Sequence, residues 1–230
     1  MSTKISIKLK NPCKPVNSCK PVNSCESETK NLTITSWNDQ HFDQLADILL
    51  NRTLLIANQK KFRLSEIEFY YCGEGHLDTY THCSNEQKMS GKFYFHKYKT
   101  GTYKSGTYKG LDITLSPDNL TYFGILIRSI QDRDTDNVTE GPCKSVNLLL
   151  EQFGHTEVKD FMKDKRAPLN IYDKEYKFHI IDTDQLVHQS IYRGPRIGLS
   201  DKYPSFRNLP YRYAINLNQI HKQKRTLNCF

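Results

Sequence analysis

The sequence predicts an α+β fold built as a single domain with a tail at each end. Segments rich in β-branched and aromatic residues follow one another directly, and the few segments with helical periodicity are interposed unevenly, which argues against a doubly wound parallel sheet. The chain has 230 residues, of which 37% are hydrophobic, including 14 Tyr and 11 Phe. This composition is sufficient for one sizeable core.

Helices are expected in three places. In residues 38–51, apolar residues recur at helical spacing and Asn38 or Asp39 can cap the first turn. That apolar stripe consists of Phe42, Leu45, Ala46 and Leu49. A second helix is predicted over 141–154, with Pro142 in its first turn and Gly154 at its end. A short third helix is predicted from about Thr156 to Asp164.

Strands account for most of the remaining pattern. Residues 54–71 (LLIANQKKFRLSEIEFYY) contain a short apolar run, a polar turn and a β-rich run, which predicts a hairpin. Further strands are predicted at 94–98, 110–115, 121–130, 176–181, 193–199 and 211–217.

The two ends differ from the predicted domain at 36–218. The motif CKPVNS occurs at 13–18 and again at 19–24, and Cys25 follows. Three thiolates can bind a soft metal, but no histidine or fourth ligand lies nearby, so residues 1–35 are expected to form a disordered repeat arm. Residues 219–230 are basic, and either contact a phosphate backbone or form a solvated tail.

The charge balance favours a polyanionic partner without demanding one. Lys and Arg total 33 against 25 for Asp and Glu, a surplus of +8, which suits nucleic acid or a lysine-rich surface kept for solubility. No apolar run approaches the length of a membrane span, and the first residues lack the apolar core of a signal peptide. We therefore expect an intracellular protein without a membrane partner.

The densest group of titratable residues lies in 62–83, FRLSEIEFYYCGEGHLDTYTHC. In an extended strand, Glu66, Glu68 and Tyr70 share the face opposite the apolar residues. Glu66 is expected on a solvent-exposed face. The aromatic residues around Glu68 would exclude water and raise its pKa, which is what a general base near neutral pH requires.

The histidines of this region leave two interpretations open. His76, Asp78, Tyr80 and His82 recur at every second position. In a strand they would share a face and, with His96, could bind a metal. In a loop they would hydrogen-bond one another or contact phosphate.

Two later strands carry unexpected polar residues. Arg128 is the only charge in FGILIRSI, and a buried guanidinium needs a carboxylate or phosphate partner, for which Glu68 and Asp112 are the candidates. In YKGLDIT, Lys109, Asp112 and Thr114 interrupt a β-prone run. These side chains are candidate site residues.

Taken in order, six segments resemble the pattern of the alkyladenine DNA glycosylase family over residues 41–217. They are LADILLNRTLL, SEIEFYY, DTYTHC, GILIRSI, GPCKSVNLLL, and PRIGLS with PYRYAI. The resemblance implies a single α+β domain with a curved, mostly antiparallel sheet flanked by helices. It also implies a monomer that needs no metal or other cofactor.

The same resemblance suggests roles for individual residues. Glu68 matches the base that activates water, and Arg128 matches an arginine near that water and the DNA backbone. Tyr70 and His82 match the walls around the flipped base, and Tyr80 adds a further ring. Tyr108 stands where the family has its intercalating tyrosine.

The strand that follows departs from the family pattern. Thr114 stands where the family has an asparagine that excludes purine 2-amino groups. Lys109 and Asp112 have no family counterpart, although they remain candidate substrate-binding residues.

The expected function is therefore that of a monofunctional glycosylase in base excision repair. It would flip an alkylated or deaminated purine out of damaged double-stranded DNA and direct water to C1′. It would act in the nucleus of a eukaryotic cell, or otherwise in the cytoplasm. The alternatives are a protein of the same fold that binds nucleic acid without cleavage, and a metal-dependent hydrolase using His76, Asp78, His82 and His96.

Overall fold

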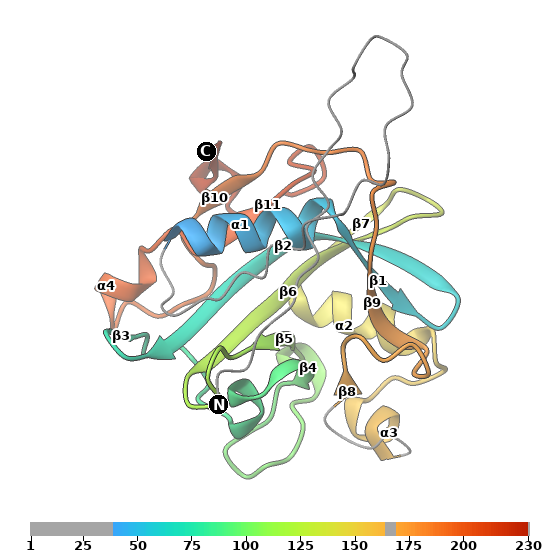
Figure 1. The fold of residues 1–230 in the computed structure, drawn as a ribbon, viewed down its shortest axis with the longest axis horizontal. Helices are drawn as coiled ribbons and strands as arrows, with labels where there is room; N and C mark the ends of the chain where they lie inside the picture. The colour runs from blue at the N-terminus through green and yellow to red at the C-terminus, as the bar shows by residue number, and fades with distance from the viewer. Residues whose placement is uncertain (1–38, 164–168, 230) are drawn as a thin grey trace, which may run out of the picture.

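A computed structural model describes residues 39–163 and 169–229 (Figure 1). The repeat arm expected at 1–35 lies outside these residues. The described chain contains helices α1 Asp39–Asn51, α2 Pro142–Glu151, α3 Val158–Lys163 and α4 Pro204–Arg207. It also contains the 3-10 helices η1 Asn85–Lys88, η2 Gly106–Tyr108 and η3 Lys224–Thr226.

The strands of the described chain are β1 Thr53–Ala57, β2 Lys60–Gly73, β3 His76–Leu77, β4 Ser90–Phe95, β5 Leu111–Leu115, β6 Tyr122–Asp132, β7 Val138–Glu140, β8 Leu169–Asn170, β9 Phe178–Asp182, β10 Tyr192–Gly194, β11 Arg212–Ala214 and β12 Asn228–Cys229. They form one sheet in the order β12-β10-β11-β2-β6-β5-β4-β8, with β1, β3, β7 and β9 paired off this path. Every pairing between these strands is antiparallel. The predicted α+β class with a mostly antiparallel sheet is confirmed.

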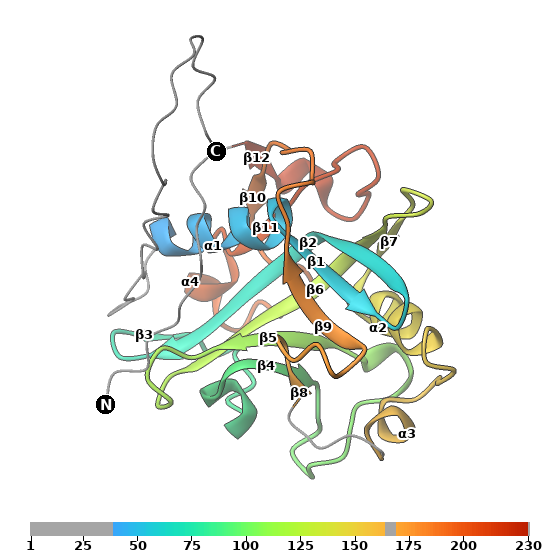
Figure 2. The ribbon, with the colours of Figure 1, turned by 45° about the vertical axis from the view of Figure 1, so that its right-hand side comes forward.

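The long strands β2 and β6 form the spine of the sheet, and they curve (Figure 2). Their register shifts between Leu64 and Glu66 and again between Glu66 and Ile67. Such a bulge bends a strand and increases its twist. The irregularity lies beside the glutamates that the sequence marks as candidate site residues.

Helix α1 lies along the sheet (Figure 1), and its apolar residues join those of the strands, α2 and α3 in one hydrophobic core. Phe42 of α1 stacks on Phe69 with ring centroids 4.7 Å apart and meets Tyr211 edge-on at 4.8 Å. All four residues of the predicted helical stripe of α1 are buried, and Leu50 and Asn51 are buried with them. This packing occupies one face of β2 and leaves its other face for polar residues.

Most predicted elements form close to their expected positions. The hairpin at 54–71 is confirmed, since Ala57 pairs with Lys60 across its turn, and the three helices form as α1, α2 and α3. The strand expected at 193–199 ends at Gly194, and the strand expected at 94–98 ends at Phe95. In both cases the rest of the segment is a loop that contacts the polar face.

The segment 219–230 does not form the separate tail that the sequence predicts. Strand β12 pairs with β10, and Ile220 and Leu227 are buried. The described part of this segment, through residue 229, therefore packs on the domain. Within the described residues, no helix combines the length and the apolar character needed to span a membrane.

Candidate active site

The sheet register aligns the candidate residues across four strands. Glu68 on β2 lies opposite Leu126 on β6, which lies opposite Asp112 on β5, which in turn lies opposite Tyr94 on β4. Directly paired residues of an antiparallel sheet project from the same face. Glu68 and Asp112 therefore share the polar face, with one strand between them.

Glu68 is fully buried and is held from three directions. Its Oε1 accepts a hydrogen bond from the Ile197 N–H at 2.7 Å and lies 3.3 Å from Nη1 of Arg128. Its Oε2 accepts a hydrogen bond from the Tyr70 hydroxyl at 2.8 Å. Burial raises the pKa of Glu68, and the attraction of Arg128 with these hydrogen bonds only partly offsets that effect. The sequence-based expectation of a raised pKa agrees with this environment.

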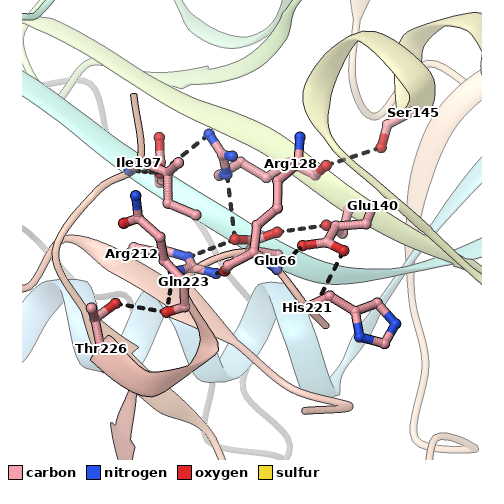
Figure 3. Close-up of polar contacts among 12 residues, drawn as sticks. Glu66, Arg128, Glu140, Ser145, Ile197, Arg212, His221, Gln223 and Thr226 are labelled. Atoms are coloured by element: carbon pink, nitrogen blue, oxygen red, sulfur yellow. Dashed lines mark hydrogen bonds and ion pairs between the residues drawn. The ribbon is translucent and has the colours of Figure 1, made fainter. Parts of the chain in front are cut away.

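Glu66 differs from its expected position on a solvent-exposed face, because it is fully buried. Its Oε1 lies 2.5 Å from Nε of Arg212 and 3.3 Å from Nε of Arg128, and its Oε2 accepts a hydrogen bond from Ser129 at 2.5 Å (Figure 3). The C-terminal segment covers this part of the sheet. Burial of Glu66 is tolerated because two guanidinium groups compensate its charge.

Arg128 bridges the two glutamates, which confirms that it has a carboxylate partner in Glu68 and adds Glu66 as a second. Its carbonyl oxygen accepts hydrogen bonds from the Gly141 N–H at 2.8 Å and from the Ser145 hydroxyl at 3.2 Å (Figure 3). The start of helix α2 thereby fixes the backbone of Arg128. Its guanidinium is placed by both the sheet and the helix.

Tyr70 is positioned by an arginine that the sequence reasoning missed. The guanidinium carbon of Arg196 lies 4.6 Å from the centre of the Tyr70 ring. Arg196 is itself buried and paired with Asp78, with Nη1 2.5 Å from Oδ2. The Tyr80 hydroxyl donates to the Ser200 carbonyl at 2.5 Å, so Tyr80 helps to hold the loop that carries Ile197. Arg196 lies in PRIGLS, one of the segments on which the resemblance rests, but no role was assigned to it.

A second polar cluster surrounds Asp112, two strands from Glu68. Asp112 is 2% exposed, and its Oδ1 lies 2.7 Å from Nε2 of His96. Its Oδ2 accepts a hydrogen bond from the Gln87 amide at 3.1 Å. A side chain at Gly124 would collide with Asp112 and Gln87, so glycine leaves room for this pair on β6.

His82 extends this cluster outward from the sheet. Its ring centre lies 4.2 Å from that of His96, and its Nε2 lies 3.3 Å from Nζ of Lys104. Desolvation of the ring and the neighbouring His96 lower the pKa of His82 to about 4. His82 is therefore neutral near pH 7 and presents an uncharged ring on the far side of the Asp112 cluster.

The four residues of the metal alternative do not converge. His76 contacts the Tyr71 carbonyl and the Tyr211 hydroxyl, and Asp78 is paired with Arg196. Residues 78–83 form turns and loop, so the alternation of a strand does not apply to them. Among the residues that the structure describes, no group of three or more His, Cys, Asp or Glu can hold a metal ion. The geometry gives this alternative no support.

Three remaining candidates occupy different environments. Lys109 is buried, with Nζ 3.1 Å from Glu157 and 2.6 Å from the Thr156 carbonyl; its role as a substrate contact stays a prediction. Thr114 is also engaged, since its hydroxyl bonds to the Lys92 backbone. Tyr108, on the turn η2, is 70% exposed. Of these three, only Tyr108 is placed to reach a large ligand.

The fold and site together define an α+β protein with a buried carboxylate and arginine centre on a curved antiparallel sheet. The chain is 46% identical over 202 residues to Uncharacterized protein L759 of Acanthamoeba polyphaga mimivirus, an alignment that covers 83% of this chain and 93% of the relative. It belongs to the same family as that protein. No family model matches the chain.

Proposed function

We propose that this protein is a monofunctional DNA glycosylase, a divergent relative of the alkyladenine DNA glycosylases, that removes alkylated or deaminated purines. The observation that carries the proposal is the environment of Glu68: a fully buried carboxylate with a raised pKa, in contact with Arg128 and Tyr70. These three residues are ones that the resemblance assigns to the reaction site. A general base needs both the geometry and the pKa that this environment supplies.

The carboxylate of Glu68 keeps an acceptor position that suits the activation of water. Each carboxylate oxygen offers two acceptor positions, and Oε2 uses one of them for the Tyr70 hydroxyl. The other position accepts a proton from water while the water oxygen attacks C1′ of the damaged nucleotide. The bond from C1′ to the base then breaks, and its electron pair leaves with the base.

The departing base needs a proton when it is a neutral purine. His96 contacts Asp112, and Asp112 lies across β6 from Glu68 at two strand spacings, about 10 Å. His96 is the group to which we assign delivery of that proton. Glu68 takes one proton from water, and His96 gives one proton to the departing base. The net reaction consumes one water and yields the free base and an abasic sugar.

The environment of the lysine nearest to Asp112 in sequence favours a monofunctional reaction. Lys109 is held by Glu157 and the Thr156 carbonyl, so its amine is occupied. A Schiff-base step would require a free amine at C1′. Hydrolysis by water is the better match to this arrangement.

The remaining elements of the proposal concern the partner. Tyr70 and neutral His82 provide rings for the flipped base, and Tyr108 is exposed for insertion into the duplex. Base–aromatic stacking is worth about 1–3 kcal/mol per ring. We propose damaged double-stranded DNA as the partner, a monomer as the active form, and an intracellular site of action, nuclear in a eukaryotic cell.

The test is excision of single lesions from defined duplexes. Duplexes carrying one hypoxanthine, ethenoadenine or 3-methyladenine-type base are incubated with the protein under single-turnover conditions, with and without chelator, and abasic sites are cleaved with alkali. Glu68→Gln is expected to lower the rate by about 10²- to 10⁴-fold, the usual contribution of a general base. Glu151→Gln, at an exposed position at the end of α2, serves as the matched control and should retain the wild-type rate.

Absence of strand breaks with every lesion would refute catalysis, and equal rates for wild type and Glu68→Gln would refute the role of Glu68.

One observation favours the alternative of binding without cleavage. Both oxygens of Glu68 already accept hydrogen bonds, and Arg196 covers part of the Tyr70 ring. Tight, lesion-selective binding without base release would support that second candidate.

A further inference from the structure

The segment from His221 to Arg225 is a basic loop whose side chains have no partner in the described part of the protein. All five residues are exposed. Lys222, Lys224 and Arg225 form no ion pair with any residue of 39–163 or 169–229. These three cationic side chains fall within four consecutive residues. The loop therefore concentrates uncompensated positive charge.

The backbone of this basic loop is fixed. The Glu140 carboxylate accepts hydrogen bonds from the N–H groups of His221, at 3.2 Å, and Lys222, at 2.7 Å. Arg212 donates to the carbonyls of Lys222 at 2.8 Å and Gln223 at 3.3 Å (Figure 3). The backbone is thus held from both sides, while the cationic side chains extend into solvent. A solvated tail would not need these anchors.

Arg212, the anchor on one side of the basic loop, is connected to the candidate active site through side-chain contacts. Arg212 is fully buried, and its Nε also contacts Glu66. Glu66 contacts Arg128, which contacts Glu68 (Figure 3). A continuous chain of side-chain contacts thus links the loop backbone to Glu68. The position of the basic loop relative to Glu68 is therefore set by a buried, charged network.

Clustered like charges on an ordered loop repel one another, so this arrangement is favourable chiefly when an anion is present. Because the loop is ordered in advance, binding a polyanion there costs little conformational entropy. We propose that the basic loop binds the phosphate backbone of duplex DNA beside the nucleotide that reaches Glu68. This inference rests on the proposed function for the identity of the nucleic acid.

Counterion release provides a quantitative test. Each phosphate contact adds about 0.9 to the slope of log K against log salt concentration for duplex DNA. The triple variant Lys222→Gln, Lys224→Gln and Arg225→Gln should therefore lower the magnitude of that slope by about 2 to 3. The measurement is fluorescence anisotropy of a labelled, undamaged duplex titrated over a range of salt concentrations.

A matched triple variant controls for the loss of net charge. Lys159, Lys174 and Lys177 are exposed and belong to the region of α3, β8 and β9, at the far end of the molecule from β12 (Figures 1 and 2). Replacing these three with Gln removes the same charge and should leave the slope within about 1 of wild type. The backbone anchors do not involve the replaced side chains, so both triple variants should unfold at the same denaturant midpoint as wild type.

The outcomes separate this inference from the proposed function. An unchanged slope in the loop variant, or an equal reduction in the control, would overturn the phosphate surface even if bases are excised. A reduced slope only in the loop variant would support it, even if Glu68→Gln shows no loss of excision. A larger effect on duplex RNA than on duplex DNA would overturn the assignment to DNA.

Discussion

Glu66 and Glu68 stand two residues apart on β2, are both fully buried, and share Arg128, but they have different electrostatic environments. Glu66 contacts a second arginine, Arg212, and the Ser129 hydroxyl. Glu68 has one shared arginine, one tyrosine hydroxyl and one backbone N–H. The pKa of Glu68 is raised because burial outweighs these contacts.

The comparison shows that two equally buried carboxylates on one strand can differ in how far their charge is compensated. Two guanidinium groups compensate the charge of Glu66, which makes it part of the framework. The weaker compensation of Glu68 leaves a carboxylate that binds a proton more readily than usual, as a general base must. Glu66 also serves Glu68 indirectly, because it holds Arg128 in place.

The largest expected effect on stability comes from Glu66→Gln. This change leaves Arg212 and much of Arg128 buried without their carboxylate, and breaking such a buried pair costs about 3–5 kcal/mol of the free energy of unfolding. Glu68→Gln should change it by only about 1 kcal/mol, because the amide is cheaper to bury than a charge and Arg128 keeps Glu66. Denaturant titrations of both variants provide the measurement, and similar losses in the two would contradict the distinction.

The next effect is the pH dependence of stability. A pKa that is raised in the folded state means that the folded protein binds the Glu68 proton more tightly than the unfolded chain. The resulting stabilisation is complete below the unfolded pKa of about 4.3 and is lost as pH rises through the folded pKa. Relative to Glu68→Gln, the wild-type protein should thus lose stability with rising pH, by at most about 1.4 kcal/mol per unit.

The test is to measure the denaturation midpoints of wild type and Glu68→Gln from pH values below about 4.3 upward through the folded pKa of Glu68. A difference between them that stays constant with pH would show that Glu68 titrates normally. The excision rate should change in the opposite direction from stability: it should rise with pH as Glu68 ionises.

The smallest expected effect comes from removing the Tyr70 hydroxyl while keeping its ring. Tyr70→Phe keeps the ring but removes a hydrogen bond that lowers the pKa of Glu68. The pH midpoint of the excision rate should therefore move upward by roughly one unit, since a hydrogen bond to a charged group is worth about 1.5–3 kcal/mol. Tyr98→Phe is the matched control, because Tyr98 is exposed and is not part of the candidate active site. Equal midpoints in all three proteins would contradict the role of Tyr70.

Local sequence patterns predicted much of the fold. The helical spacing in 38–51 and the turn between two β-rich runs in 54–71 each depend on neighbouring residues, and both elements form as expected. A lone arginine in the apolar strand 123–130 correctly indicated a buried ion pair. Arg212, the charged residue in the apolar run YRYAI, carries the same signal and would have been found by the same reasoning.

The sequence by itself determined the α+β class, the periodic core positions and the need of Arg128 for a carboxylate. Only the tertiary structure decided that Glu66 is buried, that Arg196 lies over Tyr70, and that His96 contacts Asp112. Those outcomes depend on groups far apart in the chain, such as Glu66 and Arg212, which are separated by 146 positions. Periodicity reports which face a side chain occupies, whereas the charge that compensates it depends on which distant strand or loop covers that face.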